Sequence, residues 1–169
     1  MALIYGFPPL ANGESRLLIL GSMPGRASLQ AARYYAHERN VFWRIMGDLF
    51  GAGPALDYPQ RSEKLQAAGV ALWDVMAACE RAGSLDSDIV GKSVQVNDFS
   101  AFLAVNRKIR HIFFNGAAAE ASFRRHVLPL LAGPPLHLMR LPSTSPAHAA
   151  LAYAEKLAAW SVIVALPNK

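Results

Sequence analysis

The sequence predicts an α/β fold, a three-layer α/β/α sandwich with a central four-stranded parallel sheet. Four short apolar runs alternate with segments of helical periodicity, a pattern typical of parallel strands joined by helical crossovers. Polar or turn-forming residues follow each run, as expected where the strands of an open sheet end at a binding edge. The length of 169 residues, 53% of them hydrophobic, suits a single domain over residues 1–169 with one sizeable core.

The first half of the chain supplies two expected strands and two expected helices. Residues 16–20 (RLLIL) form the first strand, because this short run is apolar after its first residue and stops at a glycine. Helical patterns follow at 41–50 and at 62–68, and Gly69 is a usual C-terminal cap for the second helix. The apolar run 70–73 is the second strand.

The second half begins with residues 84–96, which are polar and irregular and predict a surface loop. Asn97 or Asp98 then caps a helix that runs to about residue 106. The third strand is expected at 111–114. An alanine-rich helix to about residue 126 follows it.

The fourth strand, expected at 136–141, leads into the segment LPSTSPAH at 141–148. Ser145 is the expected N-cap of the last helix, with Pro146 at the first helical position and the helix ending near residue 165. A helix N-terminus with hydroxyl side chains can hold a phosphate. Capping by Ser145 is compatible with that role, since Ser143 and Thr144 would stay free.

Charge and cysteine content limit the functional class. A net charge of +5 and a pI near 9.7 fit a polyanionic partner, because Lys and Arg that neutralise phosphates release counterions. The single cysteine, Cys79, excludes an internal disulfide and a cysteine-based metal site, and favours the cytoplasm. The sequence has neither a signal-peptide pattern nor an apolar run of membrane-spanning length, so we expect no membrane contact.

Two further segments carry candidate chemistry. The loop GSMPG at 21–25 lets backbone N–H groups approach an anion, although its spacing alone favours an ordinary strand-to-helix turn, and it lacks the closing residues of a Walker loop. In YYAHERNVFW at 34–43, tyrosine faces can stack a nucleobase and the amide of Asn40 can hold a water or a base edge. The alternatives are that Asn40 only caps the next helix, that Phe42 and Trp43 are core, and that His37 is structural.

The order of these segments resembles the uracil-DNA glycosylase superfamily. GSMPG, AARYYAHERNVFW, GVALWDV, HIFFNG and LPSTSPAH follow one another over about residues 17–150, and the match is closest to the hypoxanthine-DNA glycosylase branch. The mismatch-specific uracil glycosylases are near relatives. The resemblance implies a four-stranded parallel sheet between helices and hydrolysis of the N-glycosidic bond of a flipped, deaminated base in double-stranded DNA. We expect a monomer and no cofactor, and no metal is implied because the histidines show no ligand spacing.

The resemblance assigns roles to individual residues. Residues 37–40 (HERN) occupy the place of the HPxN-type segment of the hypoxanthine branch, and this match makes Asn40 the catalytic residue. Glu38 replaces the usual proline of that segment. Met23 stands where related families carry a water-directing Asp or Asn, and Leu141 stands where several relatives carry a catalytic histidine. These two differences argue against a typical uracil enzyme.

The remaining expected contacts fall into two groups. In the first, Tyr35 would stack on the extruded base and Asp74 would read it. The base-binding residues are expected to be Met23, Tyr35, Phe42, Asp74 and Asn115. The DNA-backbone contacts are expected from Ser22, Gly25, Arg26, Ser143, Thr144, Ser145 and His148.

The motifs contain no lysine, so a Schiff-base lyase step is not expected. Three alternatives stay open: a uracil-DNA glycosylase, a non-catalytic damaged-DNA-binding module, and a nucleotide-binding domain acting on a small molecule.

Overall fold

A parallel sheet forms the centre of the molecule, as the computed structural model of the chain shows for residues 2–166. Its strands are β2 (Leu17–Gly21), β3 (Val70–Asp74), β6 (His111–Asn115) and β7 (His137–Leu141). They are ordered β3-β2-β6-β7, so β2 is hydrogen-bonded to β3 on one side and to β6 on the other. The expected four-stranded parallel sheet is confirmed.

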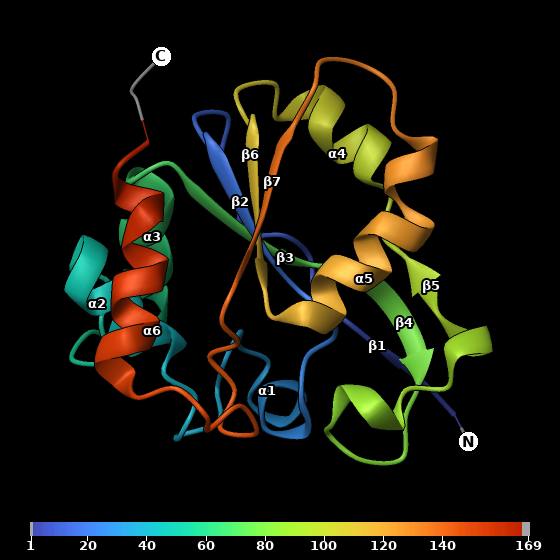
Figure 1. Cartoon of the computed structure of the whole chain (residues 1–169), viewed down its shortest axis with the longest axis horizontal. Coiled ribbons are helices and arrows are strands. Elements are labelled where there is room, and N and C mark those ends of the chain that lie inside the picture. The colour runs from blue at the N-terminus through green and yellow to red at the C-terminus, as the bar shows by residue number, and fades with distance from the viewer. Residues whose placement is uncertain (1, 167–169) are drawn as a thin grey trace.

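Helices cover both faces of this sheet (Figure 1). One face carries α2 (Phe42–Phe50), α3 (Tyr58–Ala67) and α6 (Tyr153–Trp160), and the other carries α4 (Phe99–Val105) and α5 (Ala117–His126). The side chains of β2 alternate between the two layers. Leu17 and Ile19 pack into the first core, whereas Leu18 and Leu20 pack into the second, which explains why the whole strand is apolar.

A small antiparallel sheet, ordered β1-β4-β5, was not expected from the sequence. It consists of β1 (Leu3–Tyr5), β4 (Met76–Glu80) and β5 (Gln95–Val96). The outer strands are too short to show a pattern, and β1 pairs with β4 far along the chain, Ile4 opposite Cys79. The expected loop 84–96 contains β5 and two 3-10 turns, Asp86–Asp88 and Gly91–Ser93. The short helix α1 (Arg26–Ala31) was also missed.

Two helix starts differ from the prediction. α3 begins at Tyr58 instead of residue 62, because Asp57 and Gln60 form a capping box ahead of it. α6 begins at Tyr153, and its N-cap is Ala152, so the expected helix start at Ser145 is wrong.

The segment before α6 is tied to the strand ends through Thr144. The backbone N–H of Thr144 donates to Asn115 Oδ1, and its carbonyl oxygen accepts from the N–H of Val41. These bonds hold the chain across the strand ends, and a turn at Ser145, in which its hydroxyl oxygen accepts from the N–H of Ala147, follows them. Among residues 2–166, none of the helices is long and apolar enough to cross a membrane.

Candidate active site

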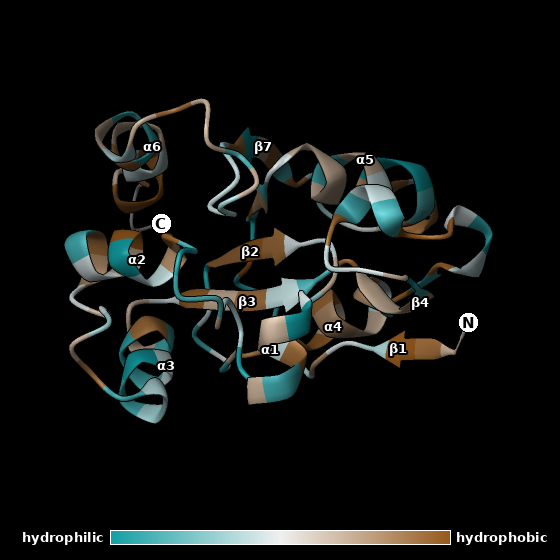
Figure 2. Cartoon of the chain, turned by 90° about the horizontal axis from the view of Figure 1, so that it is seen from below, coloured by the Kyte–Doolittle hydropathy of each residue, from teal (hydrophilic) through white to brown (hydrophobic). Residues whose placement is uncertain are grey.

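A cleft of about 750 Å³ opens at the carboxyl ends of the parallel strands. The segments around α1, before α2 and after β7 meet at this edge, which lies at the bottom of Figure 1. Figure 2 looks onto the same edge and shows that the segment leading into α2 is hydrophilic, whereas β2 is hydrophobic. The cleft therefore has the position expected for a ligand site in an open α/β sheet.

Nearly all the residues singled out in the sequence meet in this cleft. The predicted residues that line it are Ser22, Met23, Gly25, Arg26, Tyr35, Asn40, Asp74, Asn115, Ser143, Thr144, Ser145 and His148. Phe42 is the exception, because it is fully buried and lies outside the lining. The expectation that Phe42 contacts a base directly is wrong.

Three residues from three segments meet on the floor of the cleft. Gly21 ends β2 and lies opposite Asp74 in the parallel ladder. A β-carbon on Gly21 would lie 2.4 Å from Asp74 Oδ1 and 3.1 Å from the Tyr35 hydroxyl oxygen. Both polar groups therefore rest against this backbone position, and only glycine leaves room for them.

The carboxyl group of Asp74 is almost completely buried. Burial and, to a smaller extent, the charge of Asp86 raise its pKa to about 7, while the guanidinium of Arg81 partly opposes the rise. Its Oδ2 atom has no hydrogen-bond partner within the described part of the chain. Near neutral pH a large fraction of this carboxyl is protonated, so it can donate as well as accept a hydrogen bond.

Tyr35 is held in an unusual backbone conformation, with φ at +54° in the left-handed region. Its ring stacks on Phe42, with 4.0 Å between the ring centroids and 30° between the planes. Burial raises the pKa of its phenol, which stays neutral in the physiological range. Phe42 thus supports Tyr35 from inside the core, and a strained backbone at a cleft is typical of a functional position.

Asn40 is half-buried, lies just ahead of α2 and lines the cleft. Its Oδ1 atom accepts a hydrogen bond from the backbone N–H of Phe42 at 2.9 Å. The N-cap of α2 is Val41 and no side chain caps the helix, so the interpretation of Asn40 as only a helix cap is wrong. The bond to the Phe42 N–H closes a turn ahead of α2 and holds the Asn40 side chain at the edge of the cleft.

Asn115 and Thr144 bind each other through two hydrogen bonds. Asn115 Nδ2 donates to Thr144 Oγ1, and the backbone N–H of Thr144 donates to Asn115 Oδ1, each at 2.9 Å. Thr144 is only 1% exposed, so the expectation that its hydroxyl stays free for a phosphate is wrong. This pair ties the end of β6 to the segment after β7 and so fixes the relative position of the two walls.

The loop between β4 and β5 also lines the cleft, which the sequence did not indicate. Ser84, Leu85, Asp86 and Ser87 all contribute to the lining. The Ser22 hydroxyl donates to Asp86 Oδ1, and the backbone N–H of Arg26 donates to the hydroxyl oxygen of Ser84. These partners are 64 and 58 positions apart, so only the tertiary structure brings them together.

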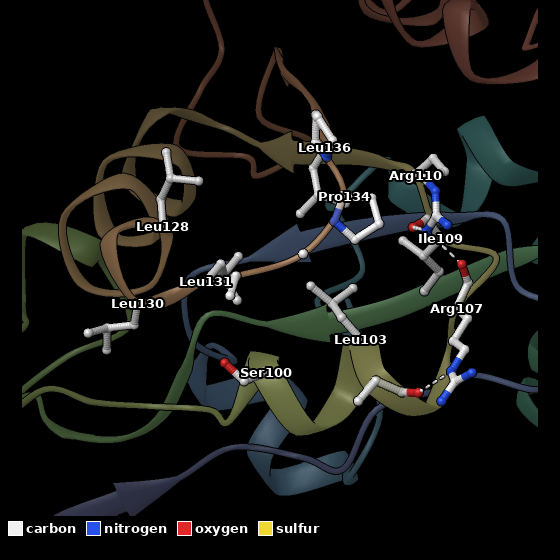
Figure 3. Close-up of a pocket in the computed structure, with 14 residues that line it drawn as sticks. Ser100, Leu103, Arg107, Ile109, Arg110, Leu128, Leu130, Leu131, Pro134 and Leu136 are labelled. Carbon is white, nitrogen blue, oxygen red and sulfur yellow. Dashed lines mark hydrogen bonds between the residues drawn. The ribbon is translucent and has the colours of Figure 1, made fainter.

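A second cavity, of about 540 Å³, lies at the opposite edge of the sheet (Figure 3). Leucines from α4, from the turn after α5 and from the segment before β7 line it, with Arg107 and Arg110 on one side. Its only hydroxyl side chain is that of Ser100, and it has no carboxylate. Among residues 2–166, no cluster of three or more His, Cys, Asp or Glu side chains is arranged to hold a metal ion. The cleft is therefore the candidate active site.

Comparisons with known proteins agree on one group of relatives. The family model "Uracil DNA glycosylase superfamily" matches residues 8–164. A protein of Methanosarcina barkeri named hypoxanthine DNA glycosylase is 37% identical over 112 residues, covering 66% of this chain and 70% of that protein. A protein of the same name from Methanosarcina acetivorans is 35% identical over 144 residues, covering 85% and 87%.

A solved structure agrees with these sequence relatives. It is the solution NMR structure of a Methanosarcina acetivorans protein provisionally named a uracil DNA glycosylase. It matches with a TM-score of 0.77 and 30% identity, over 96% of this chain and 97% of that one.

Proposed function

This chain belongs to the uracil-DNA glycosylase superfamily, and from that premise we propose that it is a deoxyinosine glycosylase that removes hypoxanthine from DNA by hydrolysing its N-glycosidic bond. One observation carries the proposal: Tyr35, Asn40 and Asp74, from separate segments, line a single cleft at the strand ends. In this proposal Tyr35 stacks on the extruded base, Asn40 positions the attacking water, and Asp74 forms hydrogen bonds with the base.

The target nucleotide has to leave the duplex before it can reach this cleft. Unstacking a base costs a few kcal/mol, and less at a mismatch, which favours damaged sites. The ring of Tyr35 offers a face for the extruded base, and its stack on Phe42 keeps that face in place. The exposed Arg26 and Arg39 at the cleft supply positive charge for the neighbouring phosphates.

Asp74 would read the base through its protonated carboxyl. Hypoxanthine presents a carbonyl oxygen beside a ring N–H, and a carboxylic acid can donate to the first and accept from the second. An ionised carboxylate would repel the carbonyl oxygen. The burial that raises the pKa of Asp74 to about 7 supports the protonated form.

Asn40 would position the attacking water. A neutral amide is a poor base, so its contribution is orientation of the water while the departing base carries the negative charge. Met23, which lines the cleft, has no group that can activate water. No lysine is among the described residues that line the cleft, which supports a monofunctional glycosylase without a lyase step.

The partner in this proposal is double-stranded DNA with one deaminated base. We also propose that residues 1–169 act as one domain, because both core clusters pack on a single parallel sheet, and that the protein acts as a monomer. The free, buried Cys79 supports a cytoplasmic location, where thiols stay reduced.

The proposal is tested with a duplex that carries one deoxyinosine, followed by alkali. Strand scission only after alkali is the expected result for the wild-type protein. Asn40→Ala should lower the rate of excision at least about 100-fold, since a misplaced water loses most of its reactivity. Asn40→Ser keeps an oxygen that can accept from the Phe42 N–H, so it should be as inactive as the alanine variant but more stable. Full activity in either variant would refute the role of Asn40.

Uracil is a second candidate substrate for the same site. It also presents a carbonyl oxygen beside a ring N–H, so the Asp74 carboxyl suits both bases. A duplex with one deoxyuridine, assayed in parallel, ranks the two substrates. DNA that is retarded in a gel but stays intact would point instead to a damaged-DNA-binding module.

A further inference from the structure

We propose that the cavity opposite the cleft is a docking site for a partner protein, which binds there through a segment with large apolar side chains and carboxylates. The cavity lies at the amino ends of two strands (Figure 3), since Arg110 directly precedes β6 and Leu136 directly precedes β7. The proposed glycosylase reaction uses only the other edge of the sheet. A docking role for this cavity is therefore independent of the proposed function.

The floor of the cavity is a part of the second core that no element of the described chain covers completely. Its leucines pack against the core cluster on this face of the sheet but stay only partly buried, and they are Leu103, Leu128, Leu131 and Leu136. The volume of about 540 Å³ is within the usual range of binding pockets, about 300–1,000 Å³. A segment that filled the cavity would remove these leucines from water, which stabilises a complex in proportion to the apolar area covered.

The rim of the cavity favours a protein segment over a small molecule. Val105 and Leu130 are the most exposed large apolar side chains of residues 2–166, at 78% and 75%. Leu130 lines the cavity, and Val105 follows the lining residue Ala104 at the end of α4. A small molecule inside the cavity would leave such side chains in water, whereas a segment that lies across the rim can cover them. Exposed apolar groups that gather at one place are typical of protein-interaction sites.

Two arginines determine which charge the partner carries. Arg107 and Arg110 are exposed on one side of the cavity, and no carboxylate lines it. Neither guanidinium takes part in an ion pair within the described part of the chain. A carboxylate beside the apolar side chains of the partner can therefore pair with either of them. The apolar contact supplies most of the affinity, and the charges select the partner and its orientation.

The cavity is ordered before a partner arrives. Arg107 Nε donates to the carbonyl oxygen of Ala104 at 3.1 Å, and a terminal nitrogen of Arg110 donates to the carbonyl oxygen of Arg107 at 2.6 Å. Two consecutive prolines, Pro134 and Pro135, stiffen another part of the wall, since each ring fixes its own φ. Little conformational freedom is then lost on binding, which favours a stable complex.

The lining is unsuited to a nucleic acid, although the arginines attract phosphates. The leucine floor offers no hydrogen bond to a base or a sugar, and Ser100 is the only hydroxyl side chain in the lining. Because the cleft and the cavity lie at opposite edges of the sheet, DNA and the partner can be bound at the same time.

The test measures fluorescence anisotropy of a labelled amphipathic peptide that has leucines at helical spacing and glutamates between them. The same peptide with lysines in place of the glutamates should bind at least about tenfold more weakly, and salt should weaken only the acidic peptide. Arg107→Glu should lower the affinity for the acidic peptide at least about tenfold. Lys64→Glu is the matched control, because it reverses an exposed charge on α3, at the other face of the sheet, and should leave the affinity unchanged.

A second variant blocks the cavity without removing charge. Ala104→Trp places a large ring at an exposed, cavity-lining position of α4 and should abolish peptide binding. Its melting temperature and its excision of hypoxanthine should match those of the wild type, so the docking role and the glycosylase function fail separately.

Four outcomes would overturn the docking role. They are equal binding of the acidic and basic peptides, binding of neither, unchanged peptide binding by Ala104→Trp, and displacement of the acidic peptide by duplex DNA, which would place the peptide in the cleft. Decanoate tests for a small occupant. If decanoate binds, Ala104→Trp blocks it and the peptide does not compete with it, the cavity is a small-molecule site instead.

Discussion

Asp74 ends a strand whose five residues are all buried, and its carboxyl group is enclosed by the core, by Gly21 and by the cleft. An aspartate in water ionises at an ordinary pKa near 3.8, whereas burial raises the pKa of this one to about 7. The folded protein thus keeps a proton that the unfolded chain loses. A single residue therefore links the stability of the fold to the chemistry of the site.

This linkage predicts a pH dependence. Below about pH 4 the carboxyl is protonated in both states, and the stability it contributes is fully present. Between about pH 4 and pH 7 only the folded state holds the proton, so that stability is lost as the pH rises through 7. Asp74→Asn has no carboxyl group to titrate and so removes this dependence. The melting temperature of the variant minus that of the wild type should therefore be larger at pH 8 than at pH 5. The corresponding change in unfolding free energy should be at least about 1 kcal/mol, since one pKa unit corresponds to about 1.4 kcal/mol.

Glu63→Gln is the control for this measurement, because it removes an exposed carboxylate on α3 that lies outside the cleft. Its effect on the melting temperature should be the same at both pH values. Excision by the wild-type protein should also fall above pH 7, as Asp74 ionises. If Asp74→Asn and the wild type show the same pH profiles, the raised pKa is wrong.

The elements of the fold are fixed largely by their ends. α3 has a capping box in which Asp57 Oδ1 accepts from the N–H of Gln60 at 2.9 Å, and the Gln60 side chain accepts from the N–H of Asp57. α4 is capped by the side chain of Asp98, which accepts from the N–H of Ala101. Neither of these two caps lies in the cleft. Stability can therefore be changed without touching the cleft by removing one of them.

Asp57→Ala should destabilise the protein by about 1 kcal/mol without lowering excision of hypoxanthine. The lost bond leaves an N–H of the first helical turn without its partner, and such caps contribute about 0.5–2 kcal/mol. Urea unfolding measures the first effect and the deoxyinosine assay the second. Asp57→Ser retains a capping oxygen and should recover most of the stability. An equal loss in both variants would show that the cap is not the cause.

At the scale of the whole molecule, the net charge of +5 is spread over several surfaces. Arg26 and Arg39 line the cleft, whereas Arg107 and Arg110 line the cavity at the opposite edge of the sheet. Only the first pair lies where DNA would enter the proposed site. The distribution of charge, more than its total, therefore orients the protein on a duplex.

Binding of duplex DNA should weaken as salt increases, because each neutralised phosphate releases counterions. Arg39→Ala should lower the affinity and reduce the slope of log K against log salt by about one. Arg107→Ala, which removes the same charge at the opposite edge, should leave the slope unchanged. Fluorescence anisotropy with a labelled duplex over a series of salt concentrations measures both. Equal slopes in Arg39→Ala and the wild type would exclude a phosphate contact at Arg39.

The sequence by itself determined the central sheet. Strands were expected at 16–20, 70–73, 111–114 and 136–141, and the structure has them at Leu17–Gly21, Val70–Asp74, His111–Asn115 and His137–Leu141. Each is an apolar run between turn residues, and burial on both faces leaves that pattern in the local sequence. The meeting of the residues that follow these strands was also predictable, because parallel strands bring their carboxyl ends to one edge of the sheet.

Tertiary structure alone decided the features that depend on distant partners. Thr144 bonds to Asn115 and Val41, and the last helix begins at Tyr153 instead of Ser145. Ser22 and Arg26 fix the loop between β4 and β5 through bonds to Asp86 and Ser84, which lie 64 and 58 positions further along the chain. The raised pKa of Asp74 depends on enclosure by the whole core. Local patterns record which side chains are buried, but they carry no information about which distant group each one meets in the folded chain.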